Sequence, residues 1–140
     1  MKFTEREMTV AVEAVAARSF EALPRLLRSR AGGTSWDTLS KGDRYPLLAA
    51  SGDLVLPALT ALPERPTVGA TPTFTDEEYE AAAEEALRQR ADRSEPGSWD
   101  GTAERKRRKA VAAGAAVLRI AVAAMPVRQD PDALIVPDHL

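Results

Sequence analysis

Two segments of the chain begin a helix in the same way, and these two starts limit the fold more than any other feature. The first is FTEREM at Phe3–Met8, in which a threonine N-cap is followed three residues later by a glutamate, the pattern of a capping box. The second, FTDEEY at Phe74–Tyr79, repeats this pattern. In both, the apolar residues before the threonine and after the glutamate hold the positions of a hydrophobic staple. We therefore expect helices to begin at Thr4 and at Thr75.

Apolar residues recur at helical spacing through most of the chain, which predicts an all-α protein with four main helices. The first helix is expected over about 4–30, with Pro24 kinking or splitting it. The others are expected over about 43–62, 76–93 and 102–125, and no segment alternates in polarity long enough to predict a strand. The side chains expected on the buried faces are Met8, Val12, Val15, Phe20, Leu23, Leu27, Leu47, Leu48, Val55, Leu56, Leu59, Leu62, Tyr79, Ala83, Ala86, Leu87, Val111, Ala115, Val117, Leu118, Ile120, Ala121, Val122 and Met125.

The two halves of the chain resemble each other. Residues 36–63 align with 99–126 without gaps, so that the two tryptophans coincide and both segments end at a proline. This match indicates two helical hairpins that arose by duplication and pack as a bundle; the alternative is a chance similarity between alanine-rich helices. We expect one bundle domain over 1–126, with half-repeats at about 3–63 and 74–126, a linker over 64–73, and an extended tail over 127–140.

The chain lacks the side chains that most catalytic and metal sites need. It contains no cysteine, which excludes a disulfide framework, a thiolate zinc site and a cysteine nucleophile. Its one histidine, His139, precedes the last residue, which argues against a catalytic triad in the core. No glycine-rich stretch has the spacing of a phosphate-binding loop. We therefore predict no catalytic residue, no cofactor and no metal, and interpret the protein as not an enzyme.

Charge and hydropathy argue against a secreted or membrane protein. The first ten residues carry charges without the apolar run of a signal peptide. The longest apolar stretch, residues 110–125, is shorter than the about 20 residues of a spanning helix and contains Arg119. We expect a cytoplasmic protein with no membrane partner. The excess of alanine and arginine over lysine, isoleucine and asparagine indicates a GC-rich bacterial genome.

The most visible local feature is a run of five consecutive cations, Arg105, Lys106, Arg107, Arg108 and Lys109. The dipole of the helix that begins there opposes such a run, which points to a binding patch for an anion or a partner. A second cluster would extend the patch if the first helix ends nearby: Arg25, Arg28 and Arg30. The alternative is that the run pairs with the six acidic residues of 76–85, as expected if the last two helices pack side by side.

Residues 36–46 resemble the middle corner of the HMG-box family. A Trp, a Leu three residues later, a Ser, a basic residue and a Pro recur there at this spacing, and here they are Trp36, Leu39, Ser40, Arg44 and Pro46. The resemblance implies a turn between two helices. The basic helices and the minor-groove wedge of that family have no counterpart in this chain, so the resemblance does not extend to DNA bending.

The C-terminal tail contains an apolar segment between two prolines. Leu134, Ile135 and Val136 form either part of a strap that packs on the bundle or a short segment that docks on a partner or a second copy. The whole pattern predicts a small helical binding or assembly module without a catalytic centre, which binds a protein partner or associates with itself as a homodimer. The alternative is a nucleic-acid-associated accessory protein that uses the basic run, nucleic acid being the less expected partner.

Overall fold

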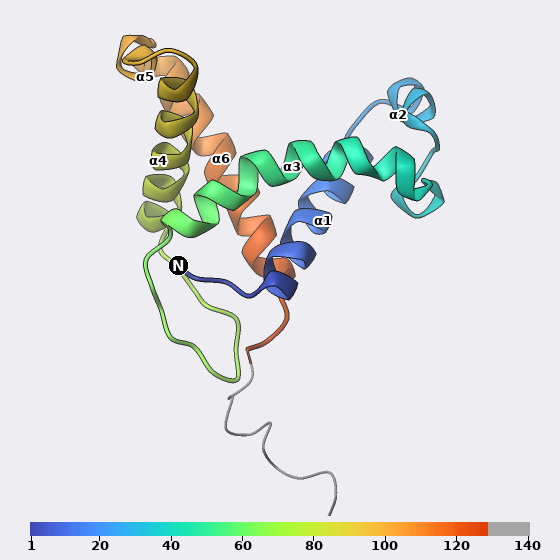
Figure 1. The fold of residues 1–140 in the computed structure, drawn as a ribbon, viewed down its shortest axis with the longest axis horizontal. Helices are drawn as coiled ribbons and strands as arrows, with labels where there is room; N and C mark the ends of the chain where they lie inside the picture. Colours follow the sequence, from blue (N-terminus) through green and yellow to red (C-terminus); the bar gives the residue numbers. More distant parts are fainter. Residues whose placement is uncertain (129–140) are drawn as a thin grey trace, which may run out of the picture.

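The fold is all-helical throughout residues 1–128, the part of the chain that the structure, a computed structural model, describes (Figure 1). Within these residues there are six α-helices, one short 3-10 turn and no strand, which confirms the predicted fold class. The elements are α1 (Glu5–Glu21), α2 (Arg25–Ala31), the 3-10 turn η1 (Trp36–Thr38), α3 (Lys41–Ala61), α4 (Asp76–Ser94), α5 (Ser98–Gly101) and α6 (Glu104–Ala124).

Four long helices form the bundle, as the two pairs α1–α3 and α4–α6 (Figure 1). The pairs also pack on each other, because α1 lies against α6 and α3 lies against α4. The core between them is aliphatic, and burial of each large side chain stabilises the fold by about 1.5–3 kcal/mol. Its most deeply buried large members are Val55, Leu59 and Leu118.

Both predicted helix starts are confirmed. The Thr4 side chain accepts a bond from the Glu7 amide, and the Glu7 carboxylate accepts one from the Thr4 amide, so both bonds of the capping box are present. Thr75 and Glu78 form the same two bonds at the start of α4. The ring centroids of Phe74 and Tyr79 lie 5.6 Å apart, as expected of a staple.

Pro24 divides the first helix, as its lack of an amide hydrogen predicts. α1 ends at Glu21 and α2 begins at Arg25, so the apolar pattern of α1 does not continue through α2. α2 contains no buried residue and projects from the bundle (Figure 1). The prediction that Leu27 is buried is therefore wrong: Leu27 is 44% exposed and its neighbour Leu26 is 64% exposed.

A tryptophan marks the turn between the two long helices of each pair. Trp36 lies in η1 and Trp99 in α5, and both side chains are buried. The backbone amide of each donates to a carboxylate at the end of the preceding long helix: Trp36 to Glu21 at 2.8 Å and Trp99 to Asp92 at 3.4 Å. The turn implied by the HMG-box resemblance is thus present at Trp36.

Two arginines from distant parts of the chain fasten the capping boxes. Arg128, which follows α6, donates bonds of 2.9 and 3.1 Å to Glu7. Arg65, in the loop after α3, donates two bonds of 2.8 Å to Glu78. Each guanidinium also lies over the phenylalanine of its box, at 5.5 Å from the ring centroid of Phe3 and 5.3 Å from that of Phe74. We call these groups the first clasp (Phe3, Thr4, Glu7, Arg128) and the second clasp (Phe74, Thr75, Glu78, Arg65).

The first residue is packed against the end of α3. Met1 is buried, and its amine donates to the backbone carbonyls of Leu59, Thr60 and Leu62. A positive charge is favourable at this position because the helix dipole makes the C-terminal end of α3 negative. The segment that leads into α1 is therefore fixed beside the loop that follows α3.

Candidate functional site

The predicted basic run occupies the first two turns of α6, and four of its five side chains are exposed. Two of its members are paired locally, Arg107 with Asp100 of α5 at 3.9 Å and Arg108 with Glu104 at 3.2 Å. Within residues 1–128, three members have no carboxylate within 4.0 Å: Arg105, Lys106 and Lys109. Most of the charge of the run is therefore turned toward solvent.

The expected ion pairs between this run and residues 76–85 are not formed in the described part of the chain, although α4 and α6 do pack side by side. The reason is that the two helices are antiparallel. Arg119, near the end of α6, pairs with Asp76 at the start of α4 at 2.8 Å, and a Cβ atom at Gly114 would lie 3.1 Å from that of Ala83. This register places the basic run beside the C-terminal half of α4, which is itself basic.

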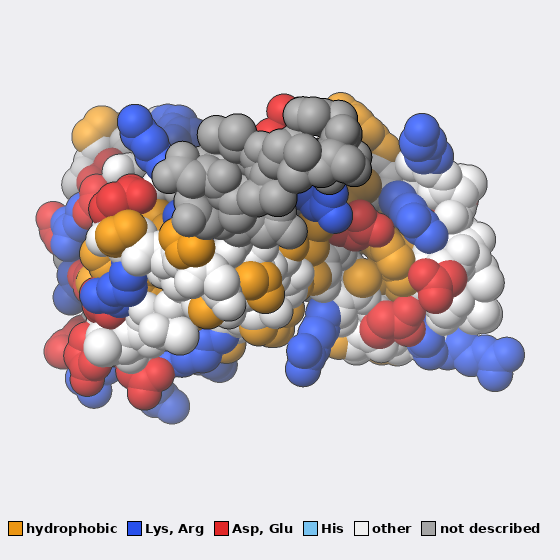
Figure 2. Space-filling model, turned by 90° about the horizontal axis from the view of Figure 1, so that it is seen from below, with side chains coloured by type: hydrophobic (Ala, Val, Ile, Leu, Met, Phe, Trp, Pro, Cys, Tyr) orange, Lys and Arg blue, Asp and Glu red, His pale blue; other side chains and the backbone are white. Residues whose placement is uncertain are grey.

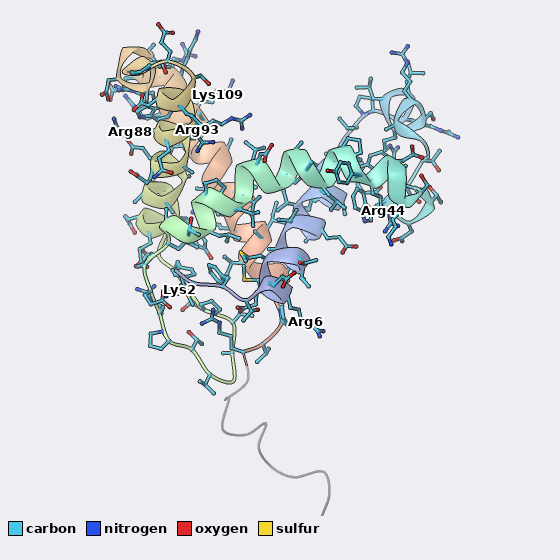
Figure 3. The ribbon with its side chains drawn as sticks, in the orientation of Figure 1. Lys2, Arg6, Arg44, Arg88, Arg93 and Lys109 are labelled. Atoms are coloured by element: carbon cyan, nitrogen blue, oxygen red, sulfur yellow. The ribbon has the colours of Figure 1, made fainter. Side chains whose placement is uncertain are left out.

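We call the joined ends of α4 and α6, residues 88–109, the basic tip. It holds eight Lys and Arg residues against four Asp and Glu residues, whereas residues 76–85 hold six acidic residues and no basic one. Figure 3 shows Arg88, Arg93 and Lys109 together at this end of the molecule, away from Arg44 at the far end of α3. One end of the protein is therefore strongly positive although the net charge of the chain is −2.

A groove with a volume of about 640 Å³ lies next to the basic tip, between α3, α4 and α6. Leu54 and Leu56 of α3 line it and are 49% and 37% exposed. Leu87 of α4 and Val117 of α6 line the opposite side. The expectation that Leu56 is buried is therefore wrong, because the core takes Val55 from this part of α3. Hollows of this size with aliphatic walls are typical of sites that bind a ligand or the side chains of a partner.

Two arginines of α4, Arg90 and Arg93, line the end of the groove that meets the basic tip. Both are exposed, and neither has a carboxylate within 4.0 Å among residues 1–128. Asp53 is the one acidic residue among the described residues that line the groove. The groove therefore combines exposed leucines with positive charge that is not neutralised, which suits an occupant that is both apolar and acidic.

The second predicted cluster of cations lies elsewhere. Arg28 of α2 pairs with Glu21 at 3.6 Å and donates to the carbonyl of Thr34 at 2.8 Å. Arg25 and Arg30 are exposed on α2, at the opposite end of the molecule from α5 and the start of α6 (Figure 1). The structure therefore does not bring the two basic clusters together into one patch.

A larger hollow, of about 870 Å³, lies at the base of the bundle and is lined by Lys2, Arg6 and Glu7 among others. Figure 2 shows this end of the molecule, on which apolar side chains are visible between charged ones. Burial raises the pKa of Glu7, but the bonds from Arg128 and Thr4 lower it by more, so that the pKa lies below its usual 4.5. Glu7 is thus held ionised in the first clasp, which is a structural role.

A search of the described residues for a metal-binding cluster and for a membrane-spanning helix found neither. No three His, Cys, Asp or Glu side chains in residues 1–128 lie close enough together to hold a metal ion. None of the described helices is both long enough and apolar enough to cross a membrane. The candidate docking residues of the tail lie outside the described residues: Leu134, Ile135 and Val136.

The most informative residues of the groove are ones that sequence reasoning did not select. Leu54, Val55 and Leu56 are consecutive, and three consecutive residues of a helix cannot all face one core. This was the available signal for an exposed apolar surface on α3. Arg90 and Arg93 carry no such signal, because only the packing of α4 against α3 shows that they meet these leucines.

A comparison of the chain with protein-family models, curated proteins and solved structures found no match.

Proposed function

We propose that this protein is a binding module without a catalytic centre of its own, and that its α3–α4–α6 groove holds an acidic, apolar segment of a protein partner. The observation that carries the proposal is the meeting of exposed Leu54 and Leu56 with the unpaired Arg90 and Arg93 in one groove. The exposed leucines leave apolar surface in water, and the two arginines repel each other without an acidic partner. A partner that is both apolar and acidic would cover the leucines and neutralise the arginines.

The shape and charge of the groove favour one recognition mode. A helix that lays its apolar face into a groove presents side chains at i, i+3, i+4 and i+7, which is how aliphatic grooves between helices are commonly filled. The basic tip would attract the acidic face of such a helix from a distance and orient it, which mainly raises the association rate. The leucines would then hold it by burial of apolar area.

Binding of a designed peptide tests this proposal. The probe is an acetylated and amidated peptide of about 16 residues with leucine at i, i+3, i+4 and i+7 and glutamate elsewhere, followed by fluorescence anisotropy. We expect binding that Leu54→Glu and Arg93→Glu each weaken at least tenfold. The matched controls Leu26→Glu and Arg25→Glu change the same residue types at exposed positions of α2 and should leave the affinity unchanged.

Two results would contradict the proposal. One is no binding of the glutamate peptide by a protein whose helical circular dichroism spectrum is intact. The other is equal weakening by the groove variants and by the α2 controls, since that would indicate attraction to the whole surface. A peptide with lysine in place of glutamate should not bind, because Arg90 and Arg93 would repel it.

A nucleic acid is the second candidate partner, favoured by the exposed and unpaired Arg105, Lys106 and Lys109. Binding to the phosphate backbone would fall steeply as salt rises, with a slope set by the number of phosphates contacted. A single-stranded DNA of about 20 nucleotides in a salt series is the probe. Tight, salt-dependent binding that the triple change Arg105→Gln, Lys106→Gln and Lys109→Gln abolishes would favour this candidate over the peptide.

A further inference from the structure

The chain itself contains a segment of the chemical class that the groove fits. In the sequence of residues 129–140, the aliphatic run Leu134–Val136 stands between Asp132 and Asp138, with Asp130 two residues before Asp132. There is no lysine or arginine in this tail, so it is acidic as well as apolar. The groove offers the complement of both properties, in Leu54, Leu56 and the cations of the basic tip.

We propose that the groove of one copy binds the tail of a second copy, so that the protein is a homodimer held by exchanged tails. This inference rests on the proposed function of the groove and names its partner. Asp132 and Asp138 would meet Arg90, Arg93 and the basic tip, and the aliphatic run would cover the exposed leucines of α3. Because each copy carries both a groove and a tail, two copies related by a two-fold axis would make both contacts at once, and such a pair is closed.

The position at which the described chain ends favours a second copy over the same copy. Arg128 lies four residues beyond the end of α6, and its side chain is bonded to Glu7 at the start of α1. The groove-lining part of α6, Ala110–Leu118, lies about 9–21 Å along the helix before that end. The described chain ends below α3, whereas Arg93 and Lys109 lie above it (Figure 3).

The length of the tail therefore limits whether it can bind the groove of its own copy. Leu134–Val136 are six to eight residues beyond Arg128, so at full extension they reach about 20–27 Å from it. To fill its own groove, the tail would need nearly all of that length and a path around α3. The tail of a second copy has no such restriction, and two exchanged tails reinforce each other because the second binds within an already joined pair.

The oligomeric state of the full chain and of two full-length variants tests the proposal. Light scattering after size-exclusion chromatography is expected to give the mass of a dimer for the unchanged protein. The tail variant Leu134→Ser, Ile135→Ser, Val136→Ser and the groove variant Leu54→Glu should each give a monomer. Leu26→Glu, the matched control on α2, should remain a dimer.

Mixing the two monomeric variants adds a test that a purely structural effect would not pass. The tail variant keeps an intact groove and the groove variant keeps an intact tail, so one tail–groove contact can form between them and none can form within either alone. We expect a mixed dimer, weaker than the dimer of the unchanged protein and lost when the groove variant also carries Asp132→Lys. A monomeric unchanged protein, or a dimer that survives the tail changes, would overturn the proposal.

Failure of this inference is distinguishable from failure of the proposed function. The acidic leucine peptide is added to the tail variant, whose groove is unchanged. If the peptide binds there while the unchanged protein is a monomer, the groove is a binding site but its partner is not a second copy. If the peptide binds the tail variant more tightly than it binds a monomeric unchanged protein, the tail occupies the groove of its own copy, and the second-copy proposal is wrong. If the peptide does not bind, both proposals fail.

Discussion

The first half of the molecule, α1 to α3, and the second half, α4 to α6, share their structural devices but differ in their surfaces. Both begin with a clasped capping box, turn at a buried tryptophan and end in an extended residue before a proline, Leu62 at φ −65° and ψ 146° and Met125 at φ −66° and ψ 147°. The clasps are also reciprocal, because Arg65 of the first half closes the box of the second and Arg128 of the second closes the box of the first.

The halves differ where the fold does not need a particular residue. The basic run of α6 aligns with residues 42–46 of α3, which contain one arginine and one aspartate and still begin a long helix. Counted from the capping threonines Thr4 and Thr75, Arg90 and Arg93 correspond to Ser19 of α1 and to Ala22, the residue after α1. The first hairpin therefore forms without positive charge at these positions, which supports a role in binding for the charge of the second. The duplication itself remains a prediction, and the halves provide matched variants for the following tests.

Removing the arginine of each clasp is expected to give the largest difference in stability between the halves. Arg128→Gln leaves the carboxylate of Glu7, which is 3% exposed, without its charged partner, and should destabilise the protein by about 2–4 kcal/mol. Arg65→Gln should have a smaller effect, because the Glu78 side chain is 24% exposed and is partly solvated without arginine. Urea unfolding measures both. Arg119→Gln, which removes a pair with the exposed Asp76, is the control, and equal losses at the two clasps would contradict the difference in burial.

The next largest loss of stability is expected where α4 and α6 pack most closely. A Cβ atom at Gly114 would lie 3.1 Å from that of Ala83, so Gly114→Val forces α4 and α6 apart and should cost about 1–3 kcal/mol. Gly42→Val in the first turn of α3 is the control, because the nearest atom is 4.0 Å away. Thermal unfolding compares them. An unchanged midpoint for Gly114→Val would mean that α4 and α6 are less closely packed than described.

The capping threonines should be equivalent in the two halves. Thr4→Ala and Thr75→Ala each remove one bond to an amide of the first turn and should destabilise by about 1 kcal/mol, with little loss of helix content. Urea unfolding with circular dichroism as the readout measures both changes. A clear loss at one threonine and none at the other would break the comparison between the halves.

These capping boxes and the apolar faces of the long helices were predictable because they depend on residues within one or two turns of each other. The split at Pro24 was predictable for the same reason. The exposure of Leu27 was not, because it follows from the projection of α2 away from the bundle. The four-residue α5 is too short to show a period in the sequence.

The candidate site was predictable only in part. The basic run is visible in the sequence, but its neighbours depend on the antiparallel register of α4 and α6 that Asp76 and Arg119 report. The clasps join residues up to 121 positions apart, and no local pattern selects Arg128 for Glu7. The leucines and arginines of the groove are likewise far apart in the sequence. Only the packing of α3 on α4 brings them together.

Acid should weaken the second clasp through Glu78. The bonds from Arg65 and then from Thr75 lower the pKa of Glu78 from 4.5 to about 2. A lowered pKa in the folded state means that the stabilisation is complete above pH 4.5 and is lost as the pH falls toward 2. Glu78→Gln should therefore be less stable than the unchanged protein at pH 7 and equal to it near pH 2. The exposure of this pair keeps the difference small, and a difference that persists near pH 2 would assign it to something other than the charge.

The smallest expected effect concerns the basic run, and its sign is informative. Within residues 1–128, Arg105, Lys106 and Lys109 have no carboxylate partner and lie at the end of α6 where the dipole is unfavourable to cations. Changing these three to Gln should therefore stabilise the isolated protein by about 0.3–1 kcal/mol at low salt. Changing Arg107 and Arg108 to Gln removes pairs with Asp100 and Glu104 and should destabilise it slightly. Both effects should shrink at high salt because the charges are exposed.

A loss of stability for the triple change would mean that the acidic residues of 76–85 compensate the run at longer range. The basic tip would then be part of the fold rather than a surface for a partner.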